Sequence, residues 1–181
     1  MFRKMRRIGQ LLPAEESERL LAEATHGVLG LTGDDGYSYT VPVSHVYRDG
    51  KICFHCAKVG HKIDALRRDD RVSFCVVAQD VVMPKERTTA FISVIAFGRA
   101  RIVEDEAGLR RIAAMVGEKY SGAYPEDCQA EIDEVIAANR MLCVEITVEH
   151  LTGKCGLEVL KQRRREQAGR GAADTAHEIN Q

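Results

Sequence analysis

The sequence has no run of apolar residues long enough to span a bilayer, and its basic start is not followed by the apolar and small-residue segments of a secretory signal. These two absences predict a cytoplasmic protein without a membrane partner. Internal repeats are missing as well. The 181 residues, of which 45% are hydrophobic and 29% charged, therefore suit one globular domain with a buried core.

The basic segment Lys161-Gln162-Arg163-Arg164-Arg165 lacks the interleaved aromatic residues on which nucleic-acid bases stack. The residues after it are rich in glycine, alanine and polar side chains and show no periodicity. We therefore expect a folded domain over residues 1–160, a disordered basic tail over residues 161–181, and no nucleic-acid partner.

The six cysteines do not resemble a disulfide framework, because most of them lie in apolar, strand-like stretches. Reduced thiols are the better interpretation. Cys53, His55, Cys56 and His61 also raise the alternative of a zinc site. Strand alternation places Cys56 opposite Cys53 and His55, and no second Cys-x-x-Cys pair follows, so no metal site is expected.

Alternating apolar and polar residues predict a mainly β protein with an antiparallel, meandering sheet and flanking helices. Strands are expected over residues 28–32, 37–47, 51–57, 71–78, 89–103 and 141–149, and residues 79–89 are expected to form a loop. Helical spacing appears over residues 13–26, 106–120 and 125–136, and the last two helices should cover one side of the sheet. Pro42 lies inside an expected strand, so that strand is at a sheet edge or bulges beside a ligand.

The most informative segment is a strand that turns through Gly60 into a short helix ending near Arg68. The first N–H groups of a helix have no helical acceptor and attract anions, and Lys62 adds a positive charge there. The junction therefore suits the phosphate of an aromatic cofactor. An ordinary strand–turn–helix connection with a solvated lysine explains the local pattern equally well.

Several motifs occur in one order along residues 8–155: Tyr-Thr-Val-Pro-Val-Ser at 39–44, His-Cys-Ala at 55–57, Gly-His-Lys at 60–62 and Ile-Ser-Val at 92–94. In this order the chain resembles the pyridoxamine 5′-phosphate oxidase-like, FMN-binding split-barrel flavoproteins, most of all the branch with the 5-nitroimidazole-resistance (Nim) proteins. The resemblance implies a six-stranded antiparallel split β-barrel with flanking helices. It also implies a homodimer with two FMN molecules at the subunit interface.

The resemblance assigns roles to particular residues. Residues 39–44, and within them Val41, Pro42, Val43 and Ser44, would lie along the isoalloxazine ring. Lys62 would pair with the phosphate. His55, Cys56 and Ala57 would line the ribityl and phosphate side, and Ser93 and Val94 would complete the site. Ile92 occupies a position where relatives often have arginine, so one phosphate or ribityl contact differs here.

The function that the resemblance implies is an FMN-dependent oxidoreductase that reduces a small oxidised substrate, as a nitroimidazole reductase does. His55 is the candidate catalytic residue, although an isolated histidine at this place would more often be structural. The alternative is a binding or electron-carrier module for flavin, haem or deazaflavin without turnover. Pyridoxamine phosphate oxidation is less favoured, because the substrate-phosphate arginines and the C-terminal arginine–histidine motif are not recognised.

Overall fold

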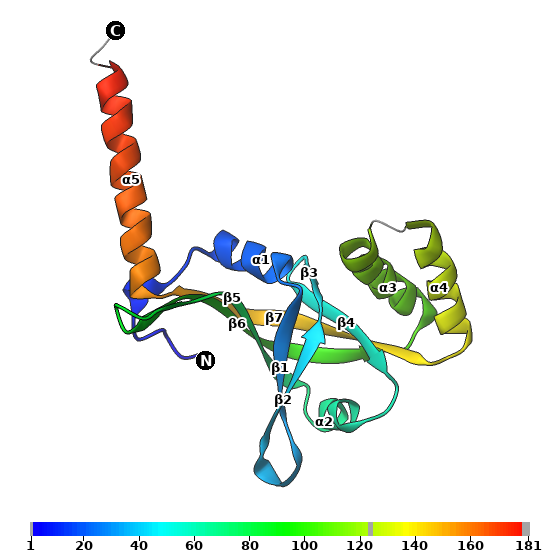
Figure 1. Cartoon of the computed structure of the whole chain (residues 1–181). Coiled ribbons are helices and arrows are strands. Elements are labelled where there is room, and N and C mark those ends of the chain that lie inside the picture. Colours follow the sequence, from blue (N-terminus) through cyan, green and yellow to red (C-terminus); the bar gives the residue numbers. More distant parts are fainter. Residues whose placement is uncertain (1, 123–124, 179–181) are drawn as a thin grey trace.

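The computed structural model describes residues 2–122 and 125–178 (Figure 1). Within these residues seven strands form one antiparallel sheet in the order β2-β1-β5-β6-β7-β4-β3. The strands are β1 (His26–Thr32), β2 (Ser38–Ser44), β3 (Val46–Arg48), β4 (Lys51–Ala57), β5 (Arg71–Met83), β6 (Thr88–Val103) and β7 (Met141–Cys155). The mainly β prediction is confirmed.

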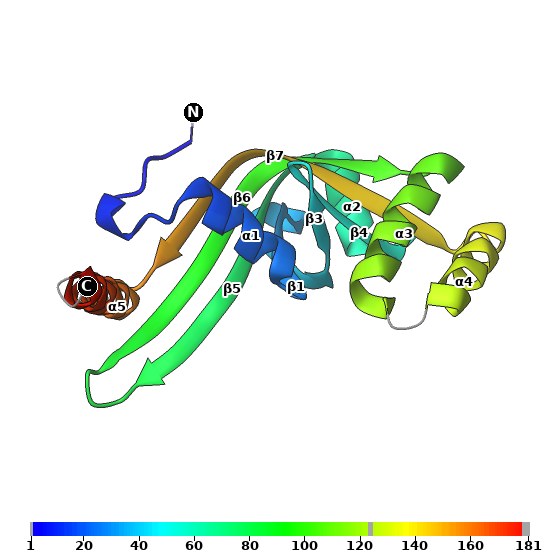
Figure 2. The same ribbon diagram turned by 90° about the horizontal axis from the view of Figure 1, so that it is seen from above.

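Five α-helices flank this sheet in the described part of the chain: α1 (Ala14–Glu23), α2 (His61–Arg68), α3 (Glu106–Ser121), α4 (Pro125–Ala137) and α5 (Leu157–Glu178). Seen from above, α3 and α4 lie at one end of the sheet and α5 at the other (Figure 2). Short 3-10 turns occur at Ile8–Gln10 and Asp34–Gly36. None of the described helices is both long and apolar enough to cross a membrane.

The sheet is strongly curved and stays open between its two edge strands, β2 and β3, which is the split barrel that the resemblance implies (Figure 1). Of the two alternatives for Pro42, a sheet edge or a bulge, the structure shows the edge, since β2 pairs only with β1 among the named strands. Seven strands replace the expected six because residues 37–47 break at His45. Its ring is fully buried and donates from Nε2 to the Leu21 carbonyl at 2.9 Å, so β2 and β3 separate there.

The β5–β6 hairpin is longer than expected, and the prediction of a loop over residues 79–89 is wrong. Strand β5 continues to Met83, and Val82 pairs with Thr89 across the hairpin. Only residues 84–87 form the turn, where Arg87 has a positive φ of 50°. The segment 79–83 has no polar–apolar alternation, and its Asp80, Val81 and Val82 are all exposed, so the pattern did not indicate a strand. The expected irregularity at Gly98 is confirmed as a register shift between Phe97 and Gly98.

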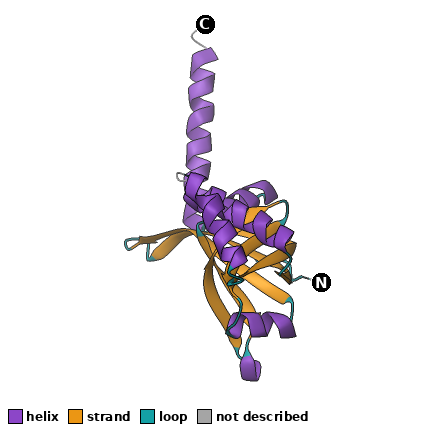
Figure 3. Ribbon diagram, turned by 90° about the vertical axis from the view of Figure 1, so that its right-hand side faces the viewer, coloured by secondary structure: helices purple, strands orange, loops and turns teal. Residues whose placement is uncertain are grey.

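Where a disordered tail was expected after residue 160, the structure has helix α5, which begins at Leu157 and projects from the body (Figure 3). Its first turns are anchored to the domain. Val159 is buried in a cluster with Leu12 and Ile92, and the Arg163 guanidinium donates to both carboxylate oxygens of Glu16 at 2.6 and 3.0 Å. The division into a domain over 1–160 and a tail over 161–181 remains a prediction.

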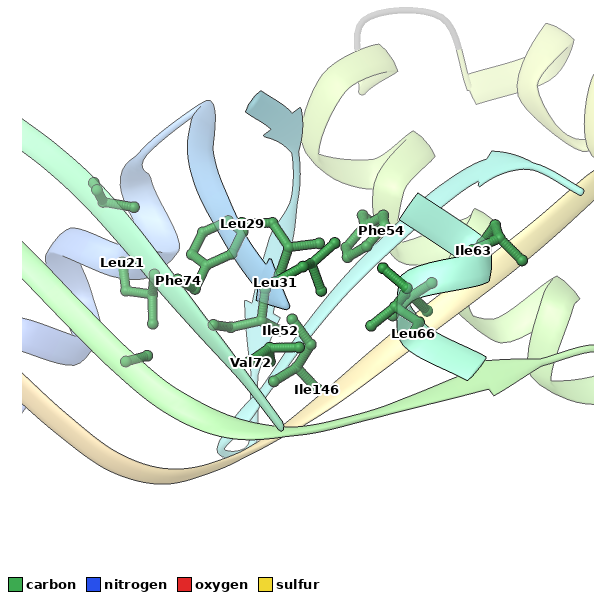
Figure 4. Close-up of a cluster of buried hydrophobic side chains, with 14 of the residues drawn as sticks. Leu21, Leu29, Leu31, Ile52, Phe54, Ile63, Leu66, Val72, Phe74 and Ile146 are labelled. Atoms are coloured by element: carbon green, nitrogen blue, oxygen red, sulfur yellow. The ribbon is translucent and has the colours of Figure 1, made fainter. Parts of the chain in front are cut away.

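The main core fills the interior of the curved sheet and is closed by α1 and α2 (Figure 4). Phe54, Phe74 and Ile146 are almost completely buried there, and Ile63 and Leu66 of α2 pack onto Phe54. A second cluster joins Cys53 of β4 to α3 through the opposite face of the same strand. Strand β4 therefore separates two packing layers.

Candidate functional site

The end of β4 borders the opening in the barrel. If the β3–β4 hairpin continued in register, Ser44 would lie opposite His55. Ser44 instead pairs with His26 of β1, so β2 and the end of β4 diverge from each other at His45. The predicted residues of β2 and β4 thus lie on the two sides of one gap.

Helix α2 begins at this gap. The ring of His61 in its first turn stacks on Tyr39 of β2 with 4.1 Å between the centroids. At the helix end, Arg68 pairs with Asp34 in the β1–β2 turn at 2.6 Å. The first turn of α2 therefore contacts β2 at Tyr39 and its end contacts the β1–β2 turn, while the roles of residues 41–44, residues 55–57 and Lys62 remain predictions.

The residues of β2 divide by alternation into two sets. The side chains of Val41 and Val43 pack against the main core, whereas Pro42 and Ser44 are exposed. Because β2 is an edge strand, one side of its backbone has no strand partner among the described residues. An edge of this kind presents unpaired main-chain N–H and C=O groups.

The start of α2 provides donors for an anion. Gly60 has a φ of 124°, a conformation that favours glycine, and its carbonyl accepts hydrogen bonds from Ile63 and Asp64 at 2.9 and 3.1 Å. His61 and Lys62 come before Ile63 in the chain, and their amide N–H groups have no backbone acceptor among the described residues. The Lys62 ammonium lies 5.7 Å from the centroid of the Phe54 ring. Main-chain donors, a helix dipole and one cation therefore meet beside β4.

Burial and the positive charge of Lys62 both act on the pKa values of His55 and Cys56. For His55 the larger cause is burial, which removes part of the water around the ring and lowers its pKa. The charge of Lys62 lowers this pKa further. Burial raises the pKa of the Cys56 thiol, although Lys62 opposes that change. At neutral pH the exposed His55 ring is therefore neutral and Cys56 is a thiol.

A cavity of about 560 Å³ continues from these residues toward α3 and α4. His55, Cys56 and Ala57 form one wall, and the helices supply the other, including Val116, Gly117, Cys128 and Ile132. Sequence reasoning missed the helical wall, because regular apolar spacing shows which side of a helix packs but not where packing leaves space. The cavity is in the size range of small-molecule sites, about 300–1,000 Å³.

Ser93 and Val94 do not join this group within one chain. On β7, Ser93 pairs with Lys154 and His55 with Cys143, which are eleven residues apart. That separation is about 36 Å along the strand. The Val94 side chain is fully buried in the main core, while Ser93 lies opposite the exposed Val77 on the outer face.

A separate ion cluster lies on the other side of α3. Glu145 is only 4% exposed and accepts hydrogen bonds from Lys51 at 3.0 Å, Arg101 at 3.2 Å and Arg111 at 2.6 Å. Burial alone would raise the pKa of this carboxyl, but the three donors outweigh it and hold the pKa at about 2. The cluster ties α3 to the sheet and was not predicted, because its four members are far apart in sequence.

Comparison with known proteins agrees with this geometry. A sequence profile described as pyridoxamine 5′-phosphate oxidase matches residues 13–155, whereas no curated protein matches the chain. The conserved hypothetical protein Rv2991 from Mycobacterium tuberculosis is similar in structure, with 25% identity, a TM-score of 0.70 and 83% of this chain and 90% of that chain covered.

Two other solved structures share the fold at lower identity. A candidate 5-nitroimidazole antibiotic resistance protein from Bacteroides thetaiotaomicron has 18% identity and a TM-score of 0.65, covering 80% of this chain and 86% of that one. The FAD and heme binding protein from Mycobacterium smegmatis has 17% identity and a TM-score of 0.63, covering 80% and 72%. Since the profile spans most of the sequence, the chain belongs to the pyridoxamine 5′-phosphate oxidase family.

Proposed function

We propose that the protein binds FMN and works as an FMN-dependent oxidoreductase on a small oxidised substrate. The observation that carries this proposal is the position of the first turn of α2, where His61 stacks on Tyr39 of the edge strand β2 and Lys62 lies beside Phe54 of β4. The α2 amides and Lys62 would hold the phosphate, and the β2 edge would hold the ring. The matched family and the FAD-binding neighbour support a flavin.

The bound flavin would supply the redox chemistry, and the chain would position it and handle protons. His55 is the titratable side chain at the gap that is neutral at pH 7 and beside Lys62. In its protonated form, which becomes more populated as the pH falls toward its lowered pKa, the ring can pass a proton to an acceptor that takes up electrons. The cavity between β4, α3 and α4 offers space for such an acceptor.

Visible spectroscopy of the purified protein, followed by mass determination of the released chromophore, tests the cofactor directly. FMN gives a flavin spectrum and the mass of a mononucleotide. A haem spectrum would instead support the binding-module alternative. Absence of any spectral change or fluorescence quenching when FMN is added would contradict the proposal.

The site would be completed by a second copy of the chain. Ser93 lies on an outer face that also exposes Val77 to 64%, Ile95 to 39% and Phe97 to 38%. Exposed apolar faces of this kind mark association surfaces. A homodimer that packs this face against its copy would bring Ser93 of one chain to the gap of the other, which a single chain cannot do.

We expect Val77→Asp to weaken the dimer by about 100-fold and to release FMN, because it buries a charge in the proposed interface. Sedimentation velocity and flavin fluorescence, measured on the same samples, report both effects. Tyr37→Asp is the control, since Tyr37 is 79% exposed in the β1–β2 turn away from this face. A dimer that keeps its FMN in Val77→Asp would place the interface elsewhere.

For catalysis, we expect His55→Ala to slow reoxidation of the reduced, FMN-loaded protein by a quinone or nitroaromatic at least about tenfold. In the wild type the rate should fall as the pH rises through a pKa below 6.5, because the protonated ring is the donor. Stopped-flow absorbance measures both quantities, and His55→Gln should lack the pH transition. Equal rates would make His55 a cofactor-holding residue, and a wild type no faster than free reduced FMN would favour the binding module.

A further inference from the structure

A second cavity, of about 420 Å³, lies where the N-terminal segment meets the first turns of α5. It is at the other end of the sheet from the gap, because Leu11 bridges to Lys154 of β7 whereas His55 pairs with Cys143. A small ligand in this cavity cannot also reach the α2 site of the same chain. Its lining includes Arg7, Gln10, Leu157, Leu160, Lys161 and Arg164.

The cavity has an excess of positive charge. Three of its lining residues are basic and none is acidic. Lys161 is engaged by Glu158 at 2.7 Å. Within residues 2–122 and 128–168, however, no carboxylate lies within 4.0 Å of the guanidinium of Arg7 or Arg164. Two cations therefore face the cavity region without a protein counter-ion there.

Gln10 gives an independent indication of a ligand. It lines the cavity, is only 4% exposed, and its side-chain oxygen is buried without a hydrogen-bond donor in the described part of the chain. The nearby Cys155 thiol contacts the main-chain oxygen of Gln10 at 3.8 Å and does not supply that donor. Buried polar atoms in native proteins almost always have a partner, so a donor is missing here.

We propose that this cavity binds a small phosphate ester that carries a free hydroxyl group. A phosphate has the double charge that two unpaired arginines can match, and guanidinium groups bind phosphate oxygens in pairs. The hydroxyl donates to the Gln10 side-chain oxygen. Leu157 and Leu160 provide the apolar surface for the carbon skeleton, and the volume suits a ligand of this size.

Calorimetric titration of the full chain with glycerol 3-phosphate, inorganic phosphate and glycerol tests the proposal. In the wild type, glycerol 3-phosphate should bind about tenfold more tightly than inorganic phosphate, and glycerol should not bind. The double variant Arg7→Gln/Arg164→Gln should bind glycerol 3-phosphate and inorganic phosphate at least about tenfold more weakly than the wild type. Gln10→Met should lower the affinity for glycerol 3-phosphate to the affinity for inorganic phosphate.

Two controls separate this site from others. Arg165→Gln removes a neighbouring exposed charge that does not line the cavity and should change nothing. Lys62→Ala removes the proposed flavin-phosphate contact and should also leave glycerol 3-phosphate binding intact, whether or not FMN binds at α2. No heat at millimolar concentrations, equal affinities for the two phosphates in the wild type, or an equal loss in either control would overturn the proposal. If Gln10→Met does not fold, the arginine variants still decide it.

Discussion

We expect Lys62→Ala to weaken FMN binding by about 50-fold while riboflavin affinity changes less than about threefold. The reason is that Lys62 stands in the first turn of α2, where only the phosphate of the ligand would be in reach. Riboflavin has the same ring and ribityl chain and lacks that phosphate. Quenching of flavin fluorescence during titration gives both dissociation constants.

The control for this variant is Arg67→Ala, which removes a basic side chain from the same helix at its far end. Arg67 makes only a long ion pair with Asp64, at 3.9 Å, and should leave both affinities unchanged. FAD titrated in parallel separates a mononucleotide site from one that accepts a dinucleotide. Equal losses of FMN and riboflavin in Lys62→Ala would remove Lys62 from the phosphate site.

The second large effect is expected on stability. Glu145→Gln should lower the free energy of unfolding by about 3 kcal/mol, because it leaves three cations facing one another without the buried carboxylate that neutralises them. Urea unfolding, followed by circular dichroism, measures the change. Glu149→Gln is the matched control on β7, since its partner Arg99 at 3.2 Å is half-exposed and such pairs contribute less than about 1 kcal/mol. Similar losses in both variants would contradict a special role for Glu145.

The pH dependence of stability separates two buried groups. The native pKa of Glu145 is held at about 2, below its ordinary value of 4.5, so its contribution is complete above pH 4.5 and is lost as the pH falls toward 2. Burial lowers the pKa of His45 to about 4, and the charge of Lys119 adds to this effect. The contribution of His45 is therefore complete above pH 6.5 and is lost between pH 6.5 and 4. Glu145→Gln should abolish only the more acidic part of the decline.

Local patterns were sufficient for most of the fold. Period-two alternation located the strands, and Pro42 limited its strand to a sheet edge or a bulge because proline lacks a ladder donor. The break at His45 could not be predicted, since it depends on a carbonyl of α1 that receives the buried imidazole. The helical start of α5 was missed for a similar reason. Its order comes from contacts with Leu12 and Glu16 near the other end of the sequence.

The candidate site was predicted in part. The Gly60–Lys62 junction could be recognised because a glycine between a strand and a helix is a local signal, and in the structure this junction lies beside Tyr39 of β2 and Phe54 of β4. The sequence did not predict that Ser93 lies far from His55 at the end of β4. This separation follows from the register of β7 with both β4 and β6, which only the assembled sheet defines.

The direction in which α5 leaves the body is useful for protein engineering. The helix has 22 residues and points away from the sheet, so it acts as a rigid spacer of about 33 Å (Figure 3). A reporter or reductase module fused beyond it would be held clear of β2, β4 and α2. An affinity tag before Phe2 has no such clearance, because the Phe2 ring stacks on His150 at 4.7 Å against the outer face of the sheet. Fusions to this protein therefore belong at the carboxyl end.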